Sequence, residues 1–264
     1  MRWIVLLFSL PNIVWAFQSS LSASYSDVES SAVVFNTASY KYYANDISYG
    51  NSPFTELAFL TSTSSVELFH GEIDYNNSGV GLLSSEGSYS GVEARLYQGK
   101  AYLGLSSSTM KIETGTLFDQ DSRWINVAIG LRLNDTNMLY GLYSLQSIDN
   151  AFASTEVIET GFAFKSVFTN IVIYFQSTTV TEEQTPDVNE TEILLQNFLD
   201  NNFYIALIYN DKDSELLFDQ SEGKGLSIGG AVNKSNAFNL SYTKVNNAFN
   251  EKANNIRFTM SFGF

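Results

Sequence analysis

The last eleven residues of the chain, 254–264, read NNIRFTMSFGF, and this stretch decides the fold. Apolar side chains occupy every second position from Ile256 to Phe264, with polar or small side chains between them. Successive side chains of a β-strand point to opposite faces, so this alternation predicts a strand with one apolar and one polar face. The strand runs to the end of the chain and finishes on an aromatic residue.

An apolar strand at a chain terminus needs something to cover both its face and its edge. In water, such a strand would promote aggregation. In a transmembrane β-barrel the apolar face meets lipid, the polar face meets the lumen, and pairing with the first strand removes the edge. The C-terminal stretch therefore predicts a barrel that spans a membrane.

The composition agrees with strands that lie between lipid and a watery lumen. Charged residues make up 16% of the chain, against roughly 25% in soluble domains, while Phe and Tyr number 20 and 15. The net charge of -14 disfavours nucleic acid as a partner, because phosphate contacts require Lys and Arg. Cys is absent, which excludes disulfides and thiolate metal sites, and we expect neither a metal nor a cofactor.

His70 is the only histidine in the chain, which bears on an enzymatic function. Outer-membrane proteases and lipases need a histidine beside a serine or aspartate partner. No nucleophile or oxyanion signature surrounds His70 in the sequence. We therefore expect that the protein is not an enzyme.

The first sixteen residues, MRWIVLLFSLPNIVWA, have the features of a secretory signal peptide. Arg2 supplies a positive charge ahead of an apolar run, and we expect cleavage after Ala16. The alternative is a membrane anchor, but the apolar run is shorter than the about 20 residues that a spanning helix needs. We expect residues 1–16 to be the signal peptide and residues 17–264 to form the barrel, located in the cell outer membrane.

The mature chain reads as a series of alternating segments separated by turn signals. The predicted strands cover about 19–27, 32–43, 63–74, 86–97, 100–108, 123–133, 137–147, 156–165, 169–180, 190–199, 203–209, 223–232, 238–242 and 254–264. The predicted fold class is all-β: an antiparallel transmembrane β-barrel of about fourteen strands. Twelve or sixteen strands are the alternatives, twelve if 32–43 or 190–199 is not a strand.

The expected connections alternate between short and long from the fourth strand onward. The short ones are 98–99, 134–136, 166–168, 200–202 and 233–236, and the long ones are 108–122, 148–155, 181–189, 210–222 and 247–253. Outer-membrane barrels have short periplasmic turns and longer extracellular loops, so this phase predicts that both termini lie in the periplasm.

Aromatic residues lie beside the short connections and predict a periplasmic aromatic girdle. The residues are Tyr97, Tyr102, Phe164, Phe168, Phe198, Phe203, Phe238 and Phe264. The alternative is the ordinary enrichment of aromatic residues in strands.

The signal peptide, the alternating strands and the terminal SFGF resemble those of Gram-negative outer-membrane porins. More narrowly, Tyr42 and Tyr43, the segment SPFTELAFL at 52–60 and the serine-rich start at 64–66 are similar to the general bacterial porin family. The resemblance implies passive diffusion of small solutes. It also implies that the barrel insertion machinery recognises the C-terminal strand through a terminal aromatic signal, which we assign to Phe258, Phe262 and Phe264.

Strand parity predicts which charged side chains face the lumen. The predicted pore-lining residues are Glu93, Arg95, Arg132, Glu159, Lys165 and Arg257. Acids and bases on opposite sides of a pore would create a transverse field and a constriction. Alternatively, the same residues pair across neighbouring strands and hold the wall together.

The segment 50–60 is irregular and lies on the side of the short connections. Its apolar residues need burial, so it is a candidate for an inward plug that includes Pro53, Phe54 and Glu56. The alternative is a longer turn whose end simply starts the next strand.

The predicted long loops are acidic, which would attract cations and repel anions. The acids are Glu113, Asp119, Asp121, Glu182, Glu183, Asp187, Glu190, Asp211, Asp213, Glu215, Asp219 and Glu222. Such a rim could also bind divalent cations that bridge lipopolysaccharide, or consist of solvated loops without a further role.

Three functions remain open at this stage. The first is a porin for small hydrophilic solutes that favours cations. The second is a closed structural or adhesive barrel that presents acidic loops, and the third is a transporter of hydrophobic compounds. The expected partners are outer-membrane lipids and lipopolysaccharide, small solutes and ions, the insertion machinery and a second copy of the chain in a homo-oligomer.

Overall fold

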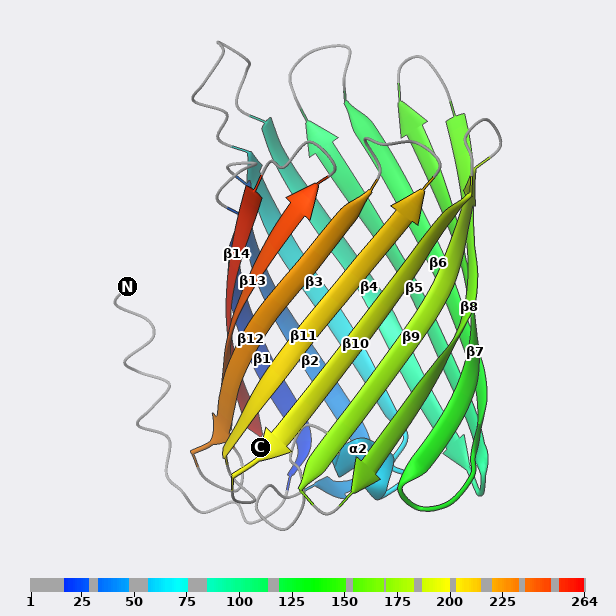
Figure 1. Ribbon diagram of the computed structural model, residues 1–264, viewed down its shortest axis with the longest axis vertical. Coiled ribbons are helices and arrows are strands. Elements are labelled where there is room, and N and C mark those ends of the chain that lie inside the picture. Colours follow the sequence, from blue (N-terminus) through cyan, green and yellow to red (C-terminus); the bar gives the residue numbers. More distant parts are fainter. Residues whose placement is uncertain are drawn as a thin grey trace.

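Fourteen antiparallel strands and one short helix make up the part of the chain that the computed structural model describes (Figure 1). The described residues are 17–28, 33–47, 57–75, 85–113, 119–150, 154–168, 170–182, 187–199, 203–214, 220–232, 236–247 and 252–263. The elements are β1 (Phe17–Val28), β2 (Val33–Ile47), α2 (Leu57–Leu60), β3 (Ser65–Tyr75), β4 (Ser85–Gln98), β5 (Ala101–Glu113), β6 (Gln120–Arg132), β7 (Asn137–Asn150), β8 (Ser154–Phe168), β9 (Ile171–Glu182), β10 (Val188–Phe198), β11 (Phe203–Ser214), β12 (Ser221–Ala231), β13 (Asn236–Asn247) and β14 (Lys252–Gly263).

Each strand pairs with its neighbours in chain order, and β14 pairs with β1 to close the barrel. The seam runs from the pair Ser20–Gly263 to the pair Val28–Asn255. Closure leaves no strand edge with unpaired backbone groups, which is the condition for a sheet to stand in lipid. The fourteen-stranded barrel predicted from the sequence is confirmed, and the alternatives of twelve and sixteen strands are wrong.

The outer face of the barrel is apolar, as β6 illustrates. Ile129 and Leu131 have 67% and 60% of their surface exposed, whereas Arg132, on the other parity, has 7%. Large apolar side chains are exposed in the same way on strands all around the barrel. In water this surface would be a severe aggregation liability, and in a bilayer it is the lipid-facing belt of an outer-membrane barrel.

The strands extend further than the alternating pattern predicts, so the connections are shorter. β7 ends at Asn150 and β8 begins at Ser154, which leaves 151–153 of the predicted long connection 148–155. The turn between β6 and β7, 133–136, is therefore no shorter than this one. Backbone pairing continues beyond the apolar belt, where outward side chains need not be apolar, and periodicity cannot detect that continuation.

Only some of the residues predicted to form the aromatic girdle lie on the outer face of the barrel. Phe168 and Phe203 are exposed on the outer face, at 54% and 45%. Phe198 is 1% exposed inside the barrel, and Tyr97 and Tyr102 line an interior cavity, so these three assignments are wrong. Proximity to a turn does not decide the side on which a residue lies, because parity along the strand does. Phe164 and Phe238 are half-buried, and Phe264 lies outside the described residues.

Tyrosines brace the interior wall by lying across glycines of the neighbouring strand. Tyr89 on β4 covers Gly71 on β3, and its hydroxyl shares a hydrogen bond with Thr37 on β2. A Cβ at Gly71 would lie 2.4 Å from the Tyr89 ring, so only glycine fits there. Tyr204 on β11 likewise covers Gly229, and its hydroxyl accepts a hydrogen bond from Asn239. Each tyrosine thereby ties three strands together.

Candidate functional site

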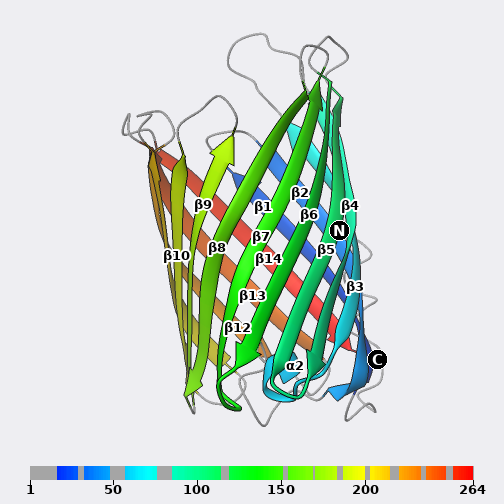
Figure 2. The same ribbon diagram turned by 90° about the vertical axis from the view of Figure 1, so that its right-hand side faces the viewer.

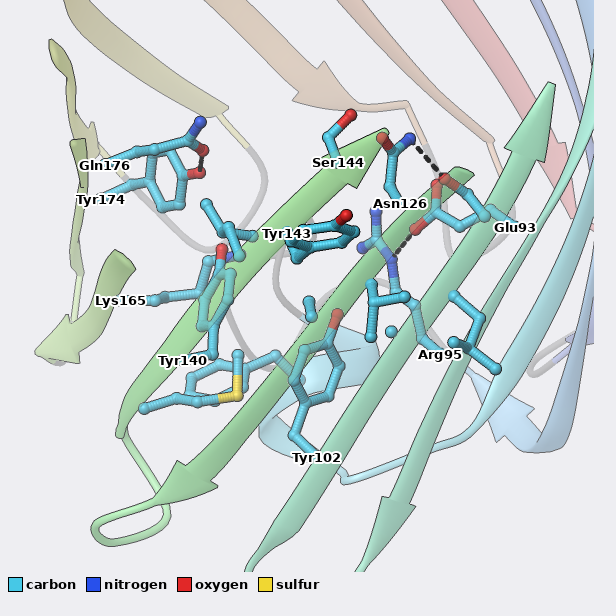
Figure 3. A pocket seen from close by; sticks show the side chains of 18 of the residues that line it. Glu93, Arg95, Tyr102, Asn126, Tyr140, Tyr143, Ser144, Lys165, Tyr174 and Gln176 are labelled. Atoms are coloured by element: carbon cyan, nitrogen blue, oxygen red, sulfur yellow. Dashed lines mark hydrogen bonds and ion pairs between the residues drawn. The ribbon is translucent and has the colours of Figure 1, made fainter. Parts of the chain in front are cut away.

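The barrel interior contains a cavity of about 590 Å³, lined by strands β4 to β10 and by α2. Figure 3 shows the Glu93–Arg95 pair and Asn126 on one side of this space and Tyr174 with Gln176 on the other. Its lining includes neutral polar, charged, aromatic and aliphatic side chains. The cavity is therefore the candidate functional site.

The floor of the cavity is the ring of Phe59, carried by α2 at the lower end of the barrel in Figure 2. Phe59 is 4% exposed and packs in an apolar cluster inside the barrel. The other buried members are Met138, Val167, Val172, Phe198, Tyr204, Ala206, Ala231 and Ala237. A segment between β2 and β3 thus enters the lumen and fills its lower end.

The backbone after α2 is tied to the strands on either side of it. The amide of Ala44 on β2 donates to the carbonyl of Ser64 at 2.8 Å, and the amide of Tyr97 on β4 donates to the Ser64 hydroxyl at 3.0 Å. Thr63 is 1% exposed. Ser62 adopts a positive φ of 51°, which turns the chain sharply from the helix into β3.

Two cations hold the Phe59 ring. The guanidinium carbon of Arg132 lies 5.4 Å from the ring centre, and the ammonium of Lys165 lies 5.9 Å from it. The Nε of Arg132 is buried without a hydrogen-bond partner among the described residues, while a terminal nitrogen donates to the backbone carbonyl of Asp135 at 2.9 Å. The aromatic face is therefore a principal contact of this buried guanidinium.

An alternating row of charges follows the wall formed by β2, β3 and β4. The ammonium of Lys41 lies 2.6 Å from the carboxylate of Glu67, and Arg95 forms an ion pair with Glu93. The Glu67 carboxylate also interacts electrostatically with Arg95, which links the two pairs. Lys41 and Glu67, which are not among the six predicted pore-lining residues, pair across neighbouring strands, whereas the predicted residues Arg95 and Glu93 pair along one strand.

Five of the described tyrosines line the cavity: Tyr97, Tyr102, Tyr140, Tyr143 and Tyr174. The ring centres of Tyr97 and Tyr102 are 5.1 Å apart, and those of Tyr102 and Tyr140 are 5.6 Å apart. The hydroxyl of Tyr174 donates a hydrogen bond to the side-chain oxygen of Gln176. The ammonium of Lys165 lies 5.8 Å from the Tyr174 ring centre. Aromatic faces therefore occupy much of this wall.

Glu159 and Glu192 bring two further carboxylates to the cavity, from β8 and β10. Neither has an ion pair or a hydrogen bond to another described residue. Glu192 and Gln176 also line a second cavity of about 370 Å³, which lies towards the upper ends of β10 to β13. The two cavities are therefore adjacent, and the two residues that they share are both polar.

The six predicted pore-lining residues fall into three places. Glu93, Arg95, Glu159 and Lys165 line the main cavity. Arg132 lies beneath it, against Phe59. Arg257 lies on the β14 wall, where its charge acts on Tyr89 across the seam region.

The remaining predicted site residues are only partly described. Pro53, Phe54 and Glu56 of the predicted plug, the signal peptide 1–16 and Phe264 lie outside the described residues. Phe258 is half-buried and Phe262 is 8% exposed, although both belong to the apolar parity of β14. Their role in membrane insertion remains a prediction.

The predicted lumen residues do not include Glu192, Tyr97 or Tyr102. Phe59 belongs to the segment 50–60, which is the candidate plug, but it is not among the residues assigned to the plug. Parity along β4 and β5 places both tyrosines on the side of Arg95, so the signal was present. For Glu192 the strand itself was uncertain. Phe59 has no period-2 signal because it lies on a helix of four residues.

His70 lies on the outer parity of β3, exposed, between Ala38 and Ser90 of the neighbouring strands. It therefore faces away from the cavity. No group of His, Asp and Glu suited to hold a metal ion occurs among the described residues.

Comparison with known proteins adds information about the fold. No family model matches the sequence, and no curated protein matches it. The outer-membrane protein Omp33 of Acinetobacter baumannii has a similar structure, with a TM-score of 0.61 and 17% identity over 95% of this chain and 99% of that one. The KdgM porin gives 0.52 and 7% over 93% and 99%, and the NanC porin gives 0.50 and 8% over 92% and 100%.

At these identities the likeness concerns architecture alone. It supports an outer-membrane, porin-like barrel, and no family model supports the narrower resemblance of residues 42–66 to the general bacterial porins. The closed sheet, its lipid-facing belt and its structural neighbours agree on one conclusion: the chain folds as an outer-membrane β-barrel of the type found in porins and channels.

Proposed function

We propose that the protein is an outer-membrane channel through which small hydrophilic solutes diffuse passively, with a preference for cations. The observation that carries the proposal is a pair of cavities inside a closed barrel, both of which have charged side chains in their linings and share Gln176 and Glu192. A barrel stabilised only as a structural element would gain more from an apolar interior than from half-buried carboxylates without partners.

The preference for cations follows from the charges of the main cavity. Three carboxylates line it, those of Glu93, Glu159 and Glu192, against the two bases Arg95 and Lys165. The chain as a whole carries a net charge of -14. A lumen and mouth with an excess of negative charge raise the local concentration of cations and lower that of anions.

The Phe59 cluster adds a barrier to this channel. It occupies the lower end, which we assign to the periplasm because the C-terminal strand finishes there. Solutes would reach the main cavity from the upper mouth. They would cross the barrel only when α2 moves away from the apolar cluster in which Phe59 packs. In this proposal the channel is narrow and mostly closed, with the plug setting its open probability.

Single-channel recording in a planar bilayer tests the proposal. We expect stepwise conductance, and in a salt gradient a reversal potential of the sign that cation preference produces. Absence of conductance steps in both the wild type and Phe59→Ala would reject the channel. A reversal potential of the opposite sign would reject only the cation preference.

A closed structural or adhesive barrel is the second candidate, and one observation favours it. Phe59 and the inward tyrosines Tyr140, Tyr174 and Tyr204 fill much of the lower interior. If Phe59→Ala inserts normally but never conducts, this reading replaces the channel. The hydrophobic-compound transporter has less support, because the cavity is lined by charged residues.

The partners follow from the same proposal. Outer-membrane lipids and lipopolysaccharide would surround the apolar belt, and the barrel insertion machinery would recognise Phe258, Phe262 and Phe264. A homo-oligomer remains part of the proposal, to be tested by native mass spectrometry. We assign the protein no catalytic activity.

A further inference from the structure

Glu192 occupies a position that the general channel proposal does not explain. Its side chain is half-buried on β10, and it lines both interior cavities. It has no ion pair or hydrogen bond to another described residue, although a carboxylate in such a place is costly without a compensating partner. A passing cation would supply that partner.

The two basic side chains of the main cavity, those of Arg95 and Lys165, already contact other residues. Arg95 pairs with Glu93, and the ammonium of Lys165 lies over the rings of Phe59 and Tyr174. Glu159 and Glu192 therefore present negative charge to the cavity without a neutralising side chain among the described residues. This arrangement attracts a positively charged solute and gives an anionic solute no comparable site.

The aromatic lining indicates what else the solute carries. Tyr174 lies on β9, next to the strand of Glu192, and interacts electrostatically with it, while Tyr140 lines the same cavity from β7. An ammonium or guanidinium group binds favourably over a tyrosine ring within about 6 Å of its centre. Lys165 over Tyr174, at 5.8 Å, shows that an alkylammonium group fits against this wall.

We propose that the main cavity binds small organic cations, in which an ammonium or guanidinium group is carried on a short carbon body. Glu192 is the anchor for the charged group, Glu159 provides the second negative charge, and the tyrosine rings contact the carbon body. A cavity of about 590 Å³ accommodates a molecule of this size together with water. The inference rests on the proposed channel, because the solute must reach the lumen.

Calorimetric titration of the mature, folded barrel in detergent tests this site without requiring conduction. Three probes of matched length separate charge from size: 1,4-diaminobutane, 1,4-butanediol and succinate, all at the same ionic strength. We expect binding of the diamine only. Glu192→Gln should weaken it about tenfold, as expected for loss of a hydrogen bond to a charged group.

Glu156→Gln is the matched control, because it makes the same change at an exposed position on the outer parity of β8. It should leave the diamine affinity unchanged, and Glu192→Asp should retain the preference for the diamine over succinate. Heat-modifiable migration on gels verifies that each variant is folded. If Glu192→Gln does not fold, the site is tested by the binding of the three probes to the wild type and by the diamine affinity of Glu159→Gln.

Several results would overturn the site. These are succinate binding as strongly as the diamine, absence of diamine binding, or equal losses in Glu192→Gln and Glu156→Gln. Diamine binding in a barrel that never conducts would reject the channel and keep the site. Conductance without diamine binding would keep the channel and reject the site.

Discussion

Arg132 lies over the ring of Phe59, with its guanidinium carbon 5.4 Å from the ring centre. The contact joins the wall of the barrel, through β6, to a segment that enters the lumen between β2 and β3. Lys165 contacts the same ring from β8 and also lines the main cavity, whereas Arg132 lies beneath that cavity. In the proposed channel, a movement of Phe59 would therefore change the surroundings of Lys165 in the cavity.

Phe59→Ala should convert the channel from mostly closed to mostly open. Truncation of a fully buried phenylalanine costs about 3–5 kcal/mol. In this protein the loss would weaken the packing of α2 inside the lumen and leave the pairing of the strands intact. The open probability in single-channel records should therefore rise by more than about a hundredfold. Phe168→Ala, at an exposed outer position, is the control, and an equal rise in that variant would contradict the plug assignment.

Arg132→Met should loosen the plug more mildly. It retains the aliphatic part of the side chain and removes a cation–π contact of about 1 kcal/mol, which predicts an approximately fivefold higher opening frequency. Arg123→Met makes the same change at an exposed position of β6 and should have no effect. Unchanged gating in Arg132→Met would show that the contact does not hold Phe59.

Gly71→Ala should destabilise the barrel by about 1–3 kcal/mol, the usual cost of overpacking. The new methyl would lie 2.4 Å from the Tyr89 ring and 2.6 Å from the backbone oxygen of Asn36, so the brace between β2 and β4 must shift. Urea titration followed by tyrosine and tryptophan fluorescence measures the change. In Gly141→Ala the nearest atoms are 3.9 Å away, and stability should be unaffected.

Arg257→Glu should increase cation selectivity while insertion into the membrane remains normal. The residue is exposed on the inward parity of β14 and acts electrostatically on Tyr89. Reversing its charge changes the field in the lumen by two units. Reversal potentials in a salt gradient measure the effect, and Lys244→Glu on the outer parity of β13 is the control. Equal shifts in both variants would place the effect at the mouth instead of the lumen.

Deletion of Phe264 should impair insertion into the outer membrane without changing the interior of those barrels that do form. The terminal strand carries the proposed recognition signal, and its last residue contributes an aromatic side chain to it. Fractionation of cell envelopes measures the amount inserted. Deletion of one residue from 151–153 is the comparison, and similar losses in both would indicate a general folding defect.

Periodicity in the sequence was sufficient to locate all fourteen strands and the two faces of β6 and β14, because lipid and lumen impose opposite requirements on alternate residues. It was not sufficient for contacts between distant segments. Phe59 contacts Arg132 and Lys165, which lie far from it in the sequence on β6 and β8, and no local pattern encodes these contacts. The inward position of Phe198 follows from its parity along β10, which nearness to a turn does not change.

The seam between β1 and β14 has a consequence for how the protein is made. The hydroxyl of Ser22 donates to that of Ser261, so the sheet closes between the first and the last of the described strands. Until the last strand arrives, any partial sheet carries two open edges that can pair with other chains. The barrel can therefore close only when β14 is present. A polypeptide that stops before β14 has thirteen of the strands but cannot form the closed barrel.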